Sequence, residues 1–374
     1  MATFTVKGVD LKFRYVAKSI VGPTTQNLFA WGNNSNGQLG ISDTTNRSSP
    51  VQIDTNSWTQ ISVGYYHSAA IKSNGTLWSC GGNSWGQLGT NNTTNYSSLA
   101  QVGTNLWNQA ACGRIHTLAI QSNGTLWAWG YGGNGRLGTN NSNNCSTPVQ
   151  VGTLSSWSQV SCGYSFTLAI QSNSTLWAWG NDAYGQLGLN TTTTYSSPVQ
   201  VGVSSNWSQL SCGQNYALSI QSNGTLWAWG MNQYGQLGQS DTTNRSSPVQ
   251  VGSNLWRQVT CGKDYSLAIQ SNGTLWAWGN NDNGQLGIGD ITLRLTPVQI
   301  GSNVWAQVTA GVIHTMAIRL NGTLWAWGNN SFGQLGISNN TNISSPVQIG
   351  ILNSWSKLVS YSNAGYTSYA LQIP

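Results

Sequence analysis

Short runs of alternating apolar and polar residues recur along this chain, separated by turns rich in glycine, asparagine and serine. Within one stretch the alternation predicts four strands, at residues 107–112, 117–120, 125–130 and 148–151. A Ser-Asn-Gly segment between the second and third of these predicts a hairpin turn, because Asn and Gly tolerate the positive φ that such turns require. No segment has the length and period of a helix. The pattern therefore predicts an all-β chain made of four-stranded units.

This unit repeats every 49 or 50 residues. The repeat is marked by the segment Gly-Gln-Leu-Gly or a close variant, whose leucines are Leu39, Leu88, Leu137, Leu187, Leu237, Leu286 and Leu335. Repeats of this length form solenoids or closed propellers, because one unit cannot bury its own apolar face. We therefore predict a single domain over residues 28–374, a seven-bladed β-propeller.

The two ends of the repeat region complement each other. Residues 28–32 and 50–53 are the last two strands of a unit, whereas 355–359 and 368–373 are the first two. Seven whole blades result only if the two ends share one blade. We therefore predict that residues 368–373 pair antiparallel with 28–32, which removes both free sheet edges.

Composition narrows the function classes. Only 6% of the 374 residues are charged, against roughly 25% in ordinary globular chains. Four of the 14 basic residues lie within the first 18 positions and the others are dispersed, so no basic stripe predicts a nucleic-acid interface. No run of 18 apolar residues predicts a membrane span, and the N-terminus lacks the continuous apolar core of a secretion signal.

Candidate chemistry is sparse. His67, His116 and His314 share one register in different repeats, where Tyr or Phe also occurs, which favours a structural hydrogen bond within the blade over metal binding. The eight acidic residues are all Asp at scattered registers and predict no paired carboxylates. Of the six cysteines, Cys112, Cys162, Cys212 and Cys261 share a register that favours small buried hydrophobes over disulfides. We predict no catalytic residue, no metal site and no cofactor.

The repeated elements Leu-Trp-Ala-Trp-Gly, Gly-Gln-Leu-Gly, Ser-Pro-Val-Gln and Cys-Gly-x-x-His-Thr-Leu-Ala-Ile resemble the repeat of the regulator of chromosome condensation (RCC1) family. The resemblance covers residues 28–374 and implies a seven-bladed propeller. The family includes an exchange factor for the small GTPase Ran, ubiquitin-ligase modules, a plant ultraviolet-B photoreceptor and bacterial β-lactamase inhibitors. The photoreceptor's Gly-Trp-Arg-His-Thr motif is missing here, so the 20 tryptophans do not indicate light sensing.

Three loop registers differ among otherwise near-identical repeats. They follow the glycine of the Gly-x-x-His turn, precede Gly-Gln-Leu-Gly, and precede Ser-Pro. Tyr, Trp and Arg anchor many interfaces, and recognition residues concentrate on loops of rigid scaffolds; drift at tolerant surface positions is the alternative. The predicted partner-binding residues are Tyr65, Tyr66, Trp85, Tyr96, Arg114, Tyr164, Tyr184, Tyr195, Tyr234, Arg245, Lys263, Arg294 and Phe332.

Residues 1–27 precede the repeats. They alternate with period two, which predicts an extended arm or hairpin. A lone hairpin is marginal in water, so we expect this arm to pack on the propeller or to add a strand to another subunit. Its predicted anchor residues are Phe4, Val6, Leu11, Phe13 and Tyr15.

The sequence alone favours a non-catalytic structural or host-adhesion protein of a virus or phage particle, located at the virion surface and held to other structural proteins by its arm. The charge-poor Asn/Thr/Ser/Gly composition, the near-copied repeats and the separate arm motivate this hypothesis, and a host-surface protein or glycan is the expected ligand. The alternative is an intracellular RCC1-type regulatory module that exchanges guanine nucleotide or binds a protein partner. An acidic face for a basic GTPase is hard to build from eight aspartates. An enzyme would need clustered carboxylates.

Overall fold

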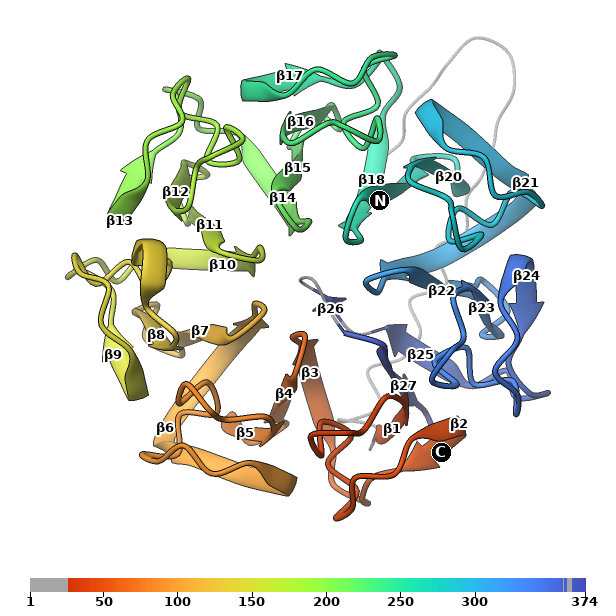
Figure 1. Cartoon of the computed structure of the whole chain (residues 1–374), viewed down its shortest axis with the longest axis horizontal. Helices are drawn as coiled ribbons and strands as arrows, with labels where there is room; N and C mark the ends of the chain where they lie inside the picture. The colour runs from red at the N-terminus through yellow and green to blue at the C-terminus, as the bar shows by residue number, and fades with distance from the viewer. Residues whose placement is uncertain (1–25, 359, 362–364) are drawn as a thin grey trace, which may run out of the picture.

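The computed structural model describes residues 26–358, 360–361 and 365–374. Within these residues the strands group into seven four-stranded antiparallel units around a central axis (Figure 1). The predicted arm, with Phe4, Val6, Leu11, Phe13 and Tyr15, lies outside the described residues, and its role stays a prediction.

Each unit, here called a blade, has four strands ordered from the axis outward. Blade 1 contains β25 (Trp355–Leu358), β27 (Thr367–Gln372), β1 (Asn27–Gly32) and β2 (Arg47–Gln52). Blade 2 contains β3 (Trp58–Val63), β4 (His67–Lys72), β5 (Thr76–Gly81) and the first part of β6 (Tyr96–Cys112). Blade 3 contains the rest of β6, β7 (His116–Gln121), β8 (Leu126–Gly130) and β9 (Cys145–Gln150), with the 3-10 turn η1 (Gly133–Gly135) after β8.

The other blades follow the same order. Blade 4 contains β10 (Trp157–Cys162), β11 (Phe166–Gln171), β12 (Leu176–Gly180) and β13 (Tyr195–Gln200). Blade 5 contains β14 (Trp207–Cys212), β15 (Tyr216–Gln221), β16 (Leu226–Gly230) and β17 (Arg245–Gln250). Blade 6 contains β18 (Trp256–Cys261), β19 (Tyr265–Gln270), β20 (Thr274–Gly279) and the first part of β21 (Arg294–Ala310). Blade 7 contains the rest of β21, β22 (His314–Arg319), β23 (Leu324–Gly328) and β24 (Ile343–Gln348).

The pairing predicted between the two chain ends is present. β27 pairs antiparallel with β1 over six residue pairs, from Asn27↔Gln372 to Gly32↔Thr367, and β25 pairs with the other edge of β27. The short strand β26 (Ser360–Tyr361) pairs parallel with β3 of blade 2. Blade 1 is thus built from both ends of the described chain.

The strands β6 and β21 are longer than the sequence pattern predicts. Each runs for 17 residues as the outer strand of one blade and continues as the innermost strand of the next. The connecting segment remains in strand conformation because it also pairs with the preceding blade, at Thr76↔Leu106 and Thr274↔Val304. At these two junctions, the connector that the sequence predicts to be a loop is therefore part of a continuous β-ladder.

The core lies between blades and is sealed by tryptophan. The second Trp of each Leu-Trp-Ala-Trp-Gly strand is fully buried, and its Nε1 donates to a backbone carbonyl of the preceding blade. Trp179, for example, donates to Arg136 O at 3.0 Å and Trp229 to Gln186 O at 3.0 Å. Indole groups with a satisfied N–H can be buried at no polar cost.

One junction is built differently. Blade 2 carries Cys80 where the other blades carry this tryptophan, and Cys80 is fully buried. Tyr369 of blade 1 fills the space, and its hydroxyl donates to Gln38 O, the carbonyl that a tryptophan would otherwise reach. The corresponding residues on the second strands of blades 3–6 are Leu118, Leu168, Leu218 and Leu267.

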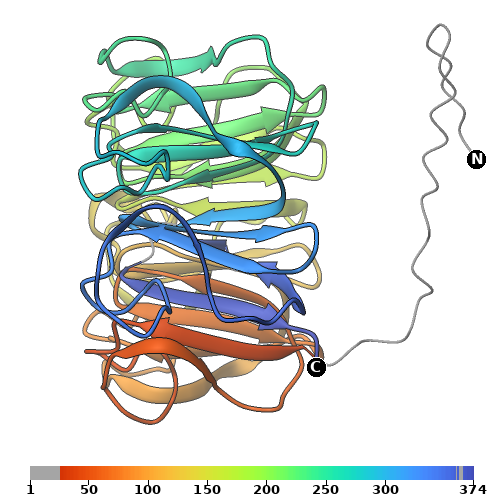
Figure 2. The ribbon, with the colours of Figure 1, turned by 90° about the vertical axis from the view of Figure 1, so that its right-hand side faces the viewer.

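Turns and loops are divided between two faces. Because consecutive strands are antiparallel, the first and third turns of every blade lie on one face, and the second turn and the inter-blade connector lie on the other. Figure 2 shows the strands running across the disc with loops on both sides. We call the first of these the turn face and the second the connector face.

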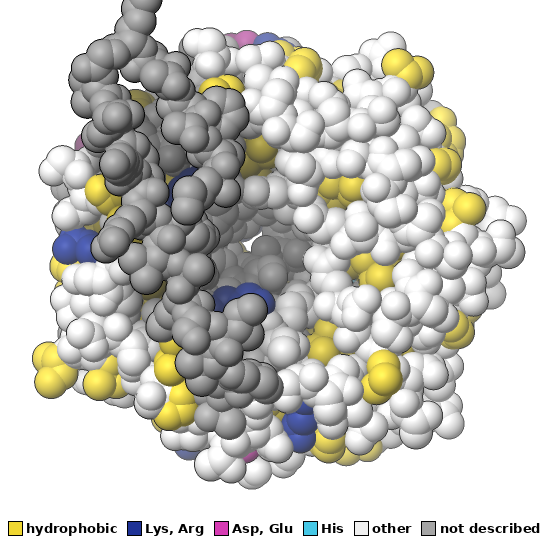
Figure 3. Space-filling view, turned by 180° about the vertical axis from the view of Figure 1, so that it is seen from behind, with side chains coloured by type: hydrophobic (Ala, Val, Ile, Leu, Met, Phe, Trp, Pro, Cys, Tyr) yellow, Lys and Arg dark blue, Asp and Glu magenta, His cyan; other side chains and the backbone are white. Residues whose placement is uncertain are grey.

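Where described residues of the connector face are in view in Figure 3, they are mostly uncharged and polar, with scattered hydrophobic side chains and few charged ones. Exposed apolar residues on the connectors include Leu106, Leu154, Val203, Leu255, Val304 and Ile351.

Candidate functional site

The first two variable registers meet on the turn face. Tyr65, Tyr66, Arg114 and Tyr164 occupy the first turns of blades 2, 3 and 4, and Phe332 lies on the loop after β23. Backbone hydrogen bonds of 3.1 Å join successive first turns, from Tyr164 N to Gln214 O and from Lys263 N to Val312 O. Gly365 N also donates to Gly64 O at 3.0 Å, so bonds of this kind join the first turn of blade 1 to that of blade 2, and those of blades 4 to 7 to one another.

Aromatic rings and one arginine form a continuous cluster across these turns. Ring centroids lie 4.6 Å apart for Tyr65–Tyr66, 6.2 Å for Tyr65–Tyr366 and 5.0 Å for Phe332–Tyr366. The Arg114 guanidinium lies 4.3 Å from the ring of Tyr164 and 5.9 Å from that of Tyr65. We call Phe332, Tyr366, Tyr65, Tyr66, Arg114 and Tyr164 the rim cluster.

The rim cluster is partly exposed and bears positive charge. All six of its side chains are half-buried, so their contact surfaces remain accessible. Burial, together with the neighbouring Tyr366, raises the pKa of Tyr65 to about 12, so its hydroxyl stays neutral. Arg114 stacks on tyrosine rings, an arrangement that favours a cation, and its Nε is buried with no acceptor in the described part of the chain.

Arg136 extends this positive region, and the sequence pattern did not identify it. It replaces the glutamine of Gly-Gln-Leu-Gly, is 4% exposed, and donates to Gly133 O at 2.8 Å and Tyr164 O at 3.2 Å. Its guanidinium lies 4.8 Å from the ring of Tyr131, and burial lowers its pKa to about 10. Its departure from Gln in one repeat was the available signal. Tyr366, also unpredicted, precedes β27, where the sequence departs from the Gly-x-x-His pattern of the other repeats.

The other residues of the first two registers are separate from the rim cluster. Trp85 is 42% exposed and packs edge-on against Tyr131 at 4.7 Å, and Tyr184 is 41% exposed. Tyr234 is half-buried. Lys263 is exposed, with its Nζ 3.8 Å from Asp264. These side chains line other sectors of the turn face.

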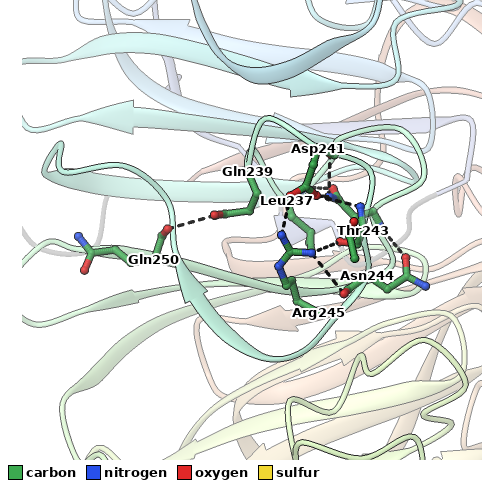
Figure 4. Close-up of polar contacts among 8 residues, drawn as sticks. Leu237, Gln239, Asp241, Thr243, Asn244, Arg245 and Gln250 are labelled. Carbon is green, nitrogen blue, oxygen red and sulfur yellow. Dashed lines mark hydrogen bonds and ion pairs between the residues drawn. The ribbon is translucent and has the colours of Figure 1, made fainter.

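The third register lies at the outer rim and is not joined to the cluster. Tyr96, Tyr195, Arg245 and Arg294 are the first residues of β6, β13, β17 and β21. The two arginines are engaged by their own loops: Arg245 pairs with Asp241 at 2.6 Å and donates to Thr243 O (Figure 4), and Arg294 pairs with Asp290 at 2.6 Å. Exposed i,i+4 pairs stabilise little, but here each holds a loop. Partner binding by these arginines stays a prediction.

Two of the three histidines at the shared register bond between blades, not within one as expected from sequence, whereas both ring nitrogens of His116 are buried without a hydrogen-bond partner among the described residues. His67 Nε2 lies 2.8 Å from Thr117 Oγ1 of the next blade, and His314 Nε2 lies 2.9 Å from Ser368 Oγ. Where the register holds Phe166, the facing residue is Ala217. The residue at this register and the residue that faces it from the next blade are therefore either both polar or both apolar. Burial lowers the pKa of His67 and of His314 to about 3.

Acid should weaken the fold through these histidines. Because the pKa of His67 is about 3 in the fold and about 6.5 unfolded, the unfolded chain binds one more proton between these values. Buried, neutral His67 therefore costs the fold nothing through titration above pH 6.5. Below that pH its titration lowers the free energy of unfolding by about 1.4 kcal/mol per pH unit. We expect the double variant His67→Phe/Thr117→Ala, which copies the Phe166–Ala217 pair, to reduce the pH slope of the urea unfolding free energy by that amount between pH 6 and 4.

Two buried aspartates change the free energy of unfolding with pH in the opposite direction to His67. The pH slope of the variant must therefore be compared with that of the parent. Burial raises the pKa of Asp182 and of Asp264 to about 6, which favours the fold as pH falls. Both remain in each protein and cancel in the difference. An unchanged slope would show that His67 does not titrate with unfolding.

Metal or nucleophilic chemistry finds no support in the described part of the chain. It contains no group of three or more His, Cys, Asp or Glu residues that could hold a metal. The six cysteines are free, and burial raises the pKa of Cys112 and of Cys261 to about 12. A buried thiol of this kind is a poor nucleophile. Among the described residues, no helix has the length and apolar character to cross a membrane.

The central channel is polar and uncharged over most of its wall. A cavity of about 260 Å³ is lined by Gln109, Gln159, Gln209, Gln258 and Gln307 together with small residues of the innermost strands. These amides bridge blades: Gln109 Nε2 donates to Val160 O and its Oε1 accepts from Val160 N. In blade 1 the register holds Lys357, whose Nζ donates to Thr59 O at 2.6 Å. The glutamines serve as inter-blade ties.

Comparisons with known proteins agree on one family. The RCC1-like domain model matches residues 108–372, and a regulator of chromosome condensation repeat model matches residues 27–71 and 74–120. No curated protein sequence matches the chain.

Solved structures show the same fold at low identity. The crystal structure of human WBSCR16 is 20% identical, with a TM-score of 0.84 over 93% of this chain and 99% of that one. Prp20p from Saccharomyces cerevisiae, described with its binding properties to Gsp1p and histones, is 22% identical, with a TM-score of 0.83 over 94% and 92% of the two chains. Yeast RCC1 (Prp20) in complex with Kap60 is 21% identical, with a TM-score of 0.82 over 100% and 96%.

The hypothesis of a virion structural or host-adhesion protein at a particle surface is wrong. The family models that match are an RCC1-like domain and an RCC1 repeat, and these findings favour the alternative. The composition that motivated the hypothesis has a structural cause. Asn34 and Asn232, both 0% exposed, accept from Leu39 N and Leu237 N at 2.9 Å and donate to carbonyls nine residues later. Abundant asparagine therefore builds loops and is not evidence of a display surface.

Proposed function

Since the chain belongs to the RCC1-like repeat family, we propose that it is a non-catalytic regulatory module that binds a protein partner through the rim cluster. The observation that carries this proposal is the continuity of half-buried aromatic rings and the Arg114 guanidinium across blades 7, 1, 2, 3 and 4. Tyr and Arg are enriched among residues that dominate binding energy. Their contacts with one another hold these side chains before a partner binds, which reduces the entropy lost on association.

The charge of this region indicates the kind of partner. Arg114 and Arg136 contribute two cations, whereas Asp182, on the loop after β12, and Asp264, in the first turn of blade 6, are buried. An acidic protein surface fits this face best. The neighbour Prp20p, described with binding properties to Gsp1p and histones, supports a protein as the partner.

Guanine nucleotide exchange is a narrower form of the proposal and can be tested separately. Release of fluorescent GDP from a Ran-type GTPase should be measured with the parent and with the double variant Tyr65→Ala/Arg114→Ala. Acceleration that only the parent produces would support exchange. No acceleration by either protein would restrict the function to binding.

We expect Tyr65→Ala/Arg114→Ala to remove the partner without unfolding the propeller, because both side chains are half-buried and lie on turns. Tagged parent and variant proteins, expressed in the source cells, should be captured and the bound proteins quantified by mass spectrometry. A specific partner should be depleted at least about tenfold from the variant, since each interface anchor of this type contributes about 2 kcal/mol or more.

Tyr195→Ala is the matched control, because Tyr195 is also a half-buried tyrosine but lies at the outer rim. It should retain the partner, and raising the salt concentration should weaken capture by parent and control alike. If the double variant captures the same proteins in the same amounts as the parent, the rim cluster is not the binding site.

A further inference from the structure

A tryptophan begins the innermost strand of each of the seven blades, and the hydrogen bonding of its indole Nε1 differs between one blade and the rest. The seven residues are Trp58, Trp107, Trp157, Trp207, Trp256, Trp305 and Trp355, and each is at most 5% exposed. Trp58 Nε1 donates to Asp54 Oδ1 at 2.8 Å, from a residue four positions earlier on the connector. In the other six, Nε1 is buried and has no acceptor in the described part of the chain. Among the described residues, this indole N–H therefore donates to a carboxylate at the junction of blades 1 and 2 and at none of the other junctions.

Glycine occupies the position of Asp54 in connectors of the same length. The connector before Trp305 places Gly301 four residues ahead of the indole, as Asp54 precedes Trp58. One bond is common to the two connectors: Gln52 Nε2 donates to Asp54 O at 3.0 Å and Gln299 Nε2 to Gly301 O at 2.8 Å. Their backbones differ, because Gly301 lies within β21 at φ +55° whereas Asp54 lies between β2 and β3. A Cβ added at Gly301 would come no nearer than 3.9 Å to another group, and the positive φ makes a side chain there strained. Space for a carboxylate therefore exists beside Trp305.

A cation accompanies the indole at two junctions. Across the ladder from Trp58 lies Lys72, whose Nζ is 5.2 Å from the Trp58 ring and 4.0 Å from the Trp78 ring. Across from Trp305 lies Arg319, 5.1 Å from the Trp305 ring and 3.7 Å from the Trp325 ring. The other openers pair with glutamine, at Gln121, Gln171, Gln221, Gln270 and Gln372.

The junction of blades 6 and 7 combines the cation with the unfilled donor. A cavity of about 420 Å³ is lined there by Gly301, Asn303, Trp305, Arg319 and Arg294. Arg319 Nε is buried and has no acceptor among the described residues, and Trp305 is 1% exposed. Arg294 is already paired with Asp290 at 2.6 Å. We call this cavity the 6–7 cleft.

We propose that the 6–7 cleft binds a carboxylate, with Trp305 Nε1 and the Arg319 guanidinium as its donors. Asp54 is the internal template for the indole donor: it shows a carboxylate oxygen on the equivalent N–H, while Lys72 lies against the same ring. An aspartate or glutamate side chain of a protein is the source that the open cleft favours, and a small free carboxylate has the same chemistry. The 6–7 cleft is separate from the rim cluster and does not depend on its function.

The test observes the indole directly. Protein labelled with ¹⁵N at tryptophan is titrated with acetyl-Ser-Asp-Ser-amide, with its Asn counterpart, and with sodium acetate; Trp305→Phe assigns the resonance. We expect a saturable downfield shift of the Trp305 indole proton with the Asp peptide and none with the Asn peptide, because only a charged acceptor bonds strongly to both donors. Arg319→Gln, which introduces the residue of other repeats, should weaken binding about tenfold.

A second pair of variants separates the site from general effects. Gly301→Asp should supply an internal carboxylate, shift the Trp305 resonance without ligand and abolish its response. Gly252→Asp makes the same change at the junction of blades 5 and 6, where Gln270 replaces the cation, and should leave the Trp305 titration unaltered. A stronger response to the peptide than to acetate identifies a protein side chain as the ligand, and an equal response identifies a small carboxylate. No shift with either, or equal shifts with the Asp and Asn peptides, would overturn the proposal.

Discussion

Removal of residues 367–374 is expected to abolish cooperative folding of the whole propeller. β27 is an interior strand of blade 1, paired with β1 on one edge and β25 on the other. Its loss exposes both neighbouring strands and removes the core side chains Tyr369, Ala370 and Leu371, each at most 1% exposed. Because blades are stabilised by their neighbours, an open ring should lose a free energy comparable to the whole stability of a domain, about 5–15 kcal/mol. Circular dichroism melting should show no sharp transition.

Two further proteins keep this prediction measurable. Deleting Pro374 alone, an exposed residue, should not change the melting curve. Leu371→Ala should fold and lose about 2–5 kcal/mol, the usual cost of truncating a buried leucine. A protein lacking 367–374 that melted like the parent would show that the closing strand does not hold the ring together.

Replacing Trp179 by alanine is expected to have the largest effect of any single substitution, a loss of about 3–5 kcal/mol in urea unfolding. Its indole is fully buried between blades 3 and 4, and its N–H bonds to Arg136 O. Trp179→Phe keeps most of the volume but leaves this carbonyl without the indole donor, which adds about 1 kcal/mol to the cost of the smaller ring.

Trp177 provides the matched control on the same strand. It is half-buried, and its Nε1 bonds locally to Thr175 Oγ1 at 3.0 Å. Trp177→Ala should therefore cost only about 1–2 kcal/mol. Equal losses at the two positions would contradict the view that inter-blade tryptophans dominate stability.

Most of the architecture could be predicted because each repeat encodes its own strands. The alternation in residues 117–120 and 125–130 is confirmed by β7 and β8, and the incomplete ends implied the β1–β27 pairing. What could not be predicted is how one blade bonds to the next. The inter-blade bond of His67 and the glutamine ties of the channel join residues about 50 positions apart, and no local pattern reports them.

The candidate site was predicted in part, for the same reason. Variation among repeats identified Tyr65, Tyr66, Arg114, Tyr164 and Phe332, which the structure brings together with Tyr366. The same criterion also selected Arg245 and Arg294, whose aspartate partners four residues earlier could have been recognised as loop ion pairs. Composition is the least reliable guide, because abundant asparagine suggests a polar surface although Asn34 and Asn232 are buried loop residues.

The exchange of tryptophan for Cys80, with Tyr369 opposite, has a consequence for assembly of the chain. Seven nearly identical modules could in principle join in the wrong order, with the final strand inserted beside a module other than its own. At six positions around the ring the receiving space already holds an indole, with which the Tyr369 ring would collide. Only the space above Gln38 accepts it. The pair of Tyr369 and Cys80 thus determines the one position at which the last strand can be inserted in a chain of similar repeats.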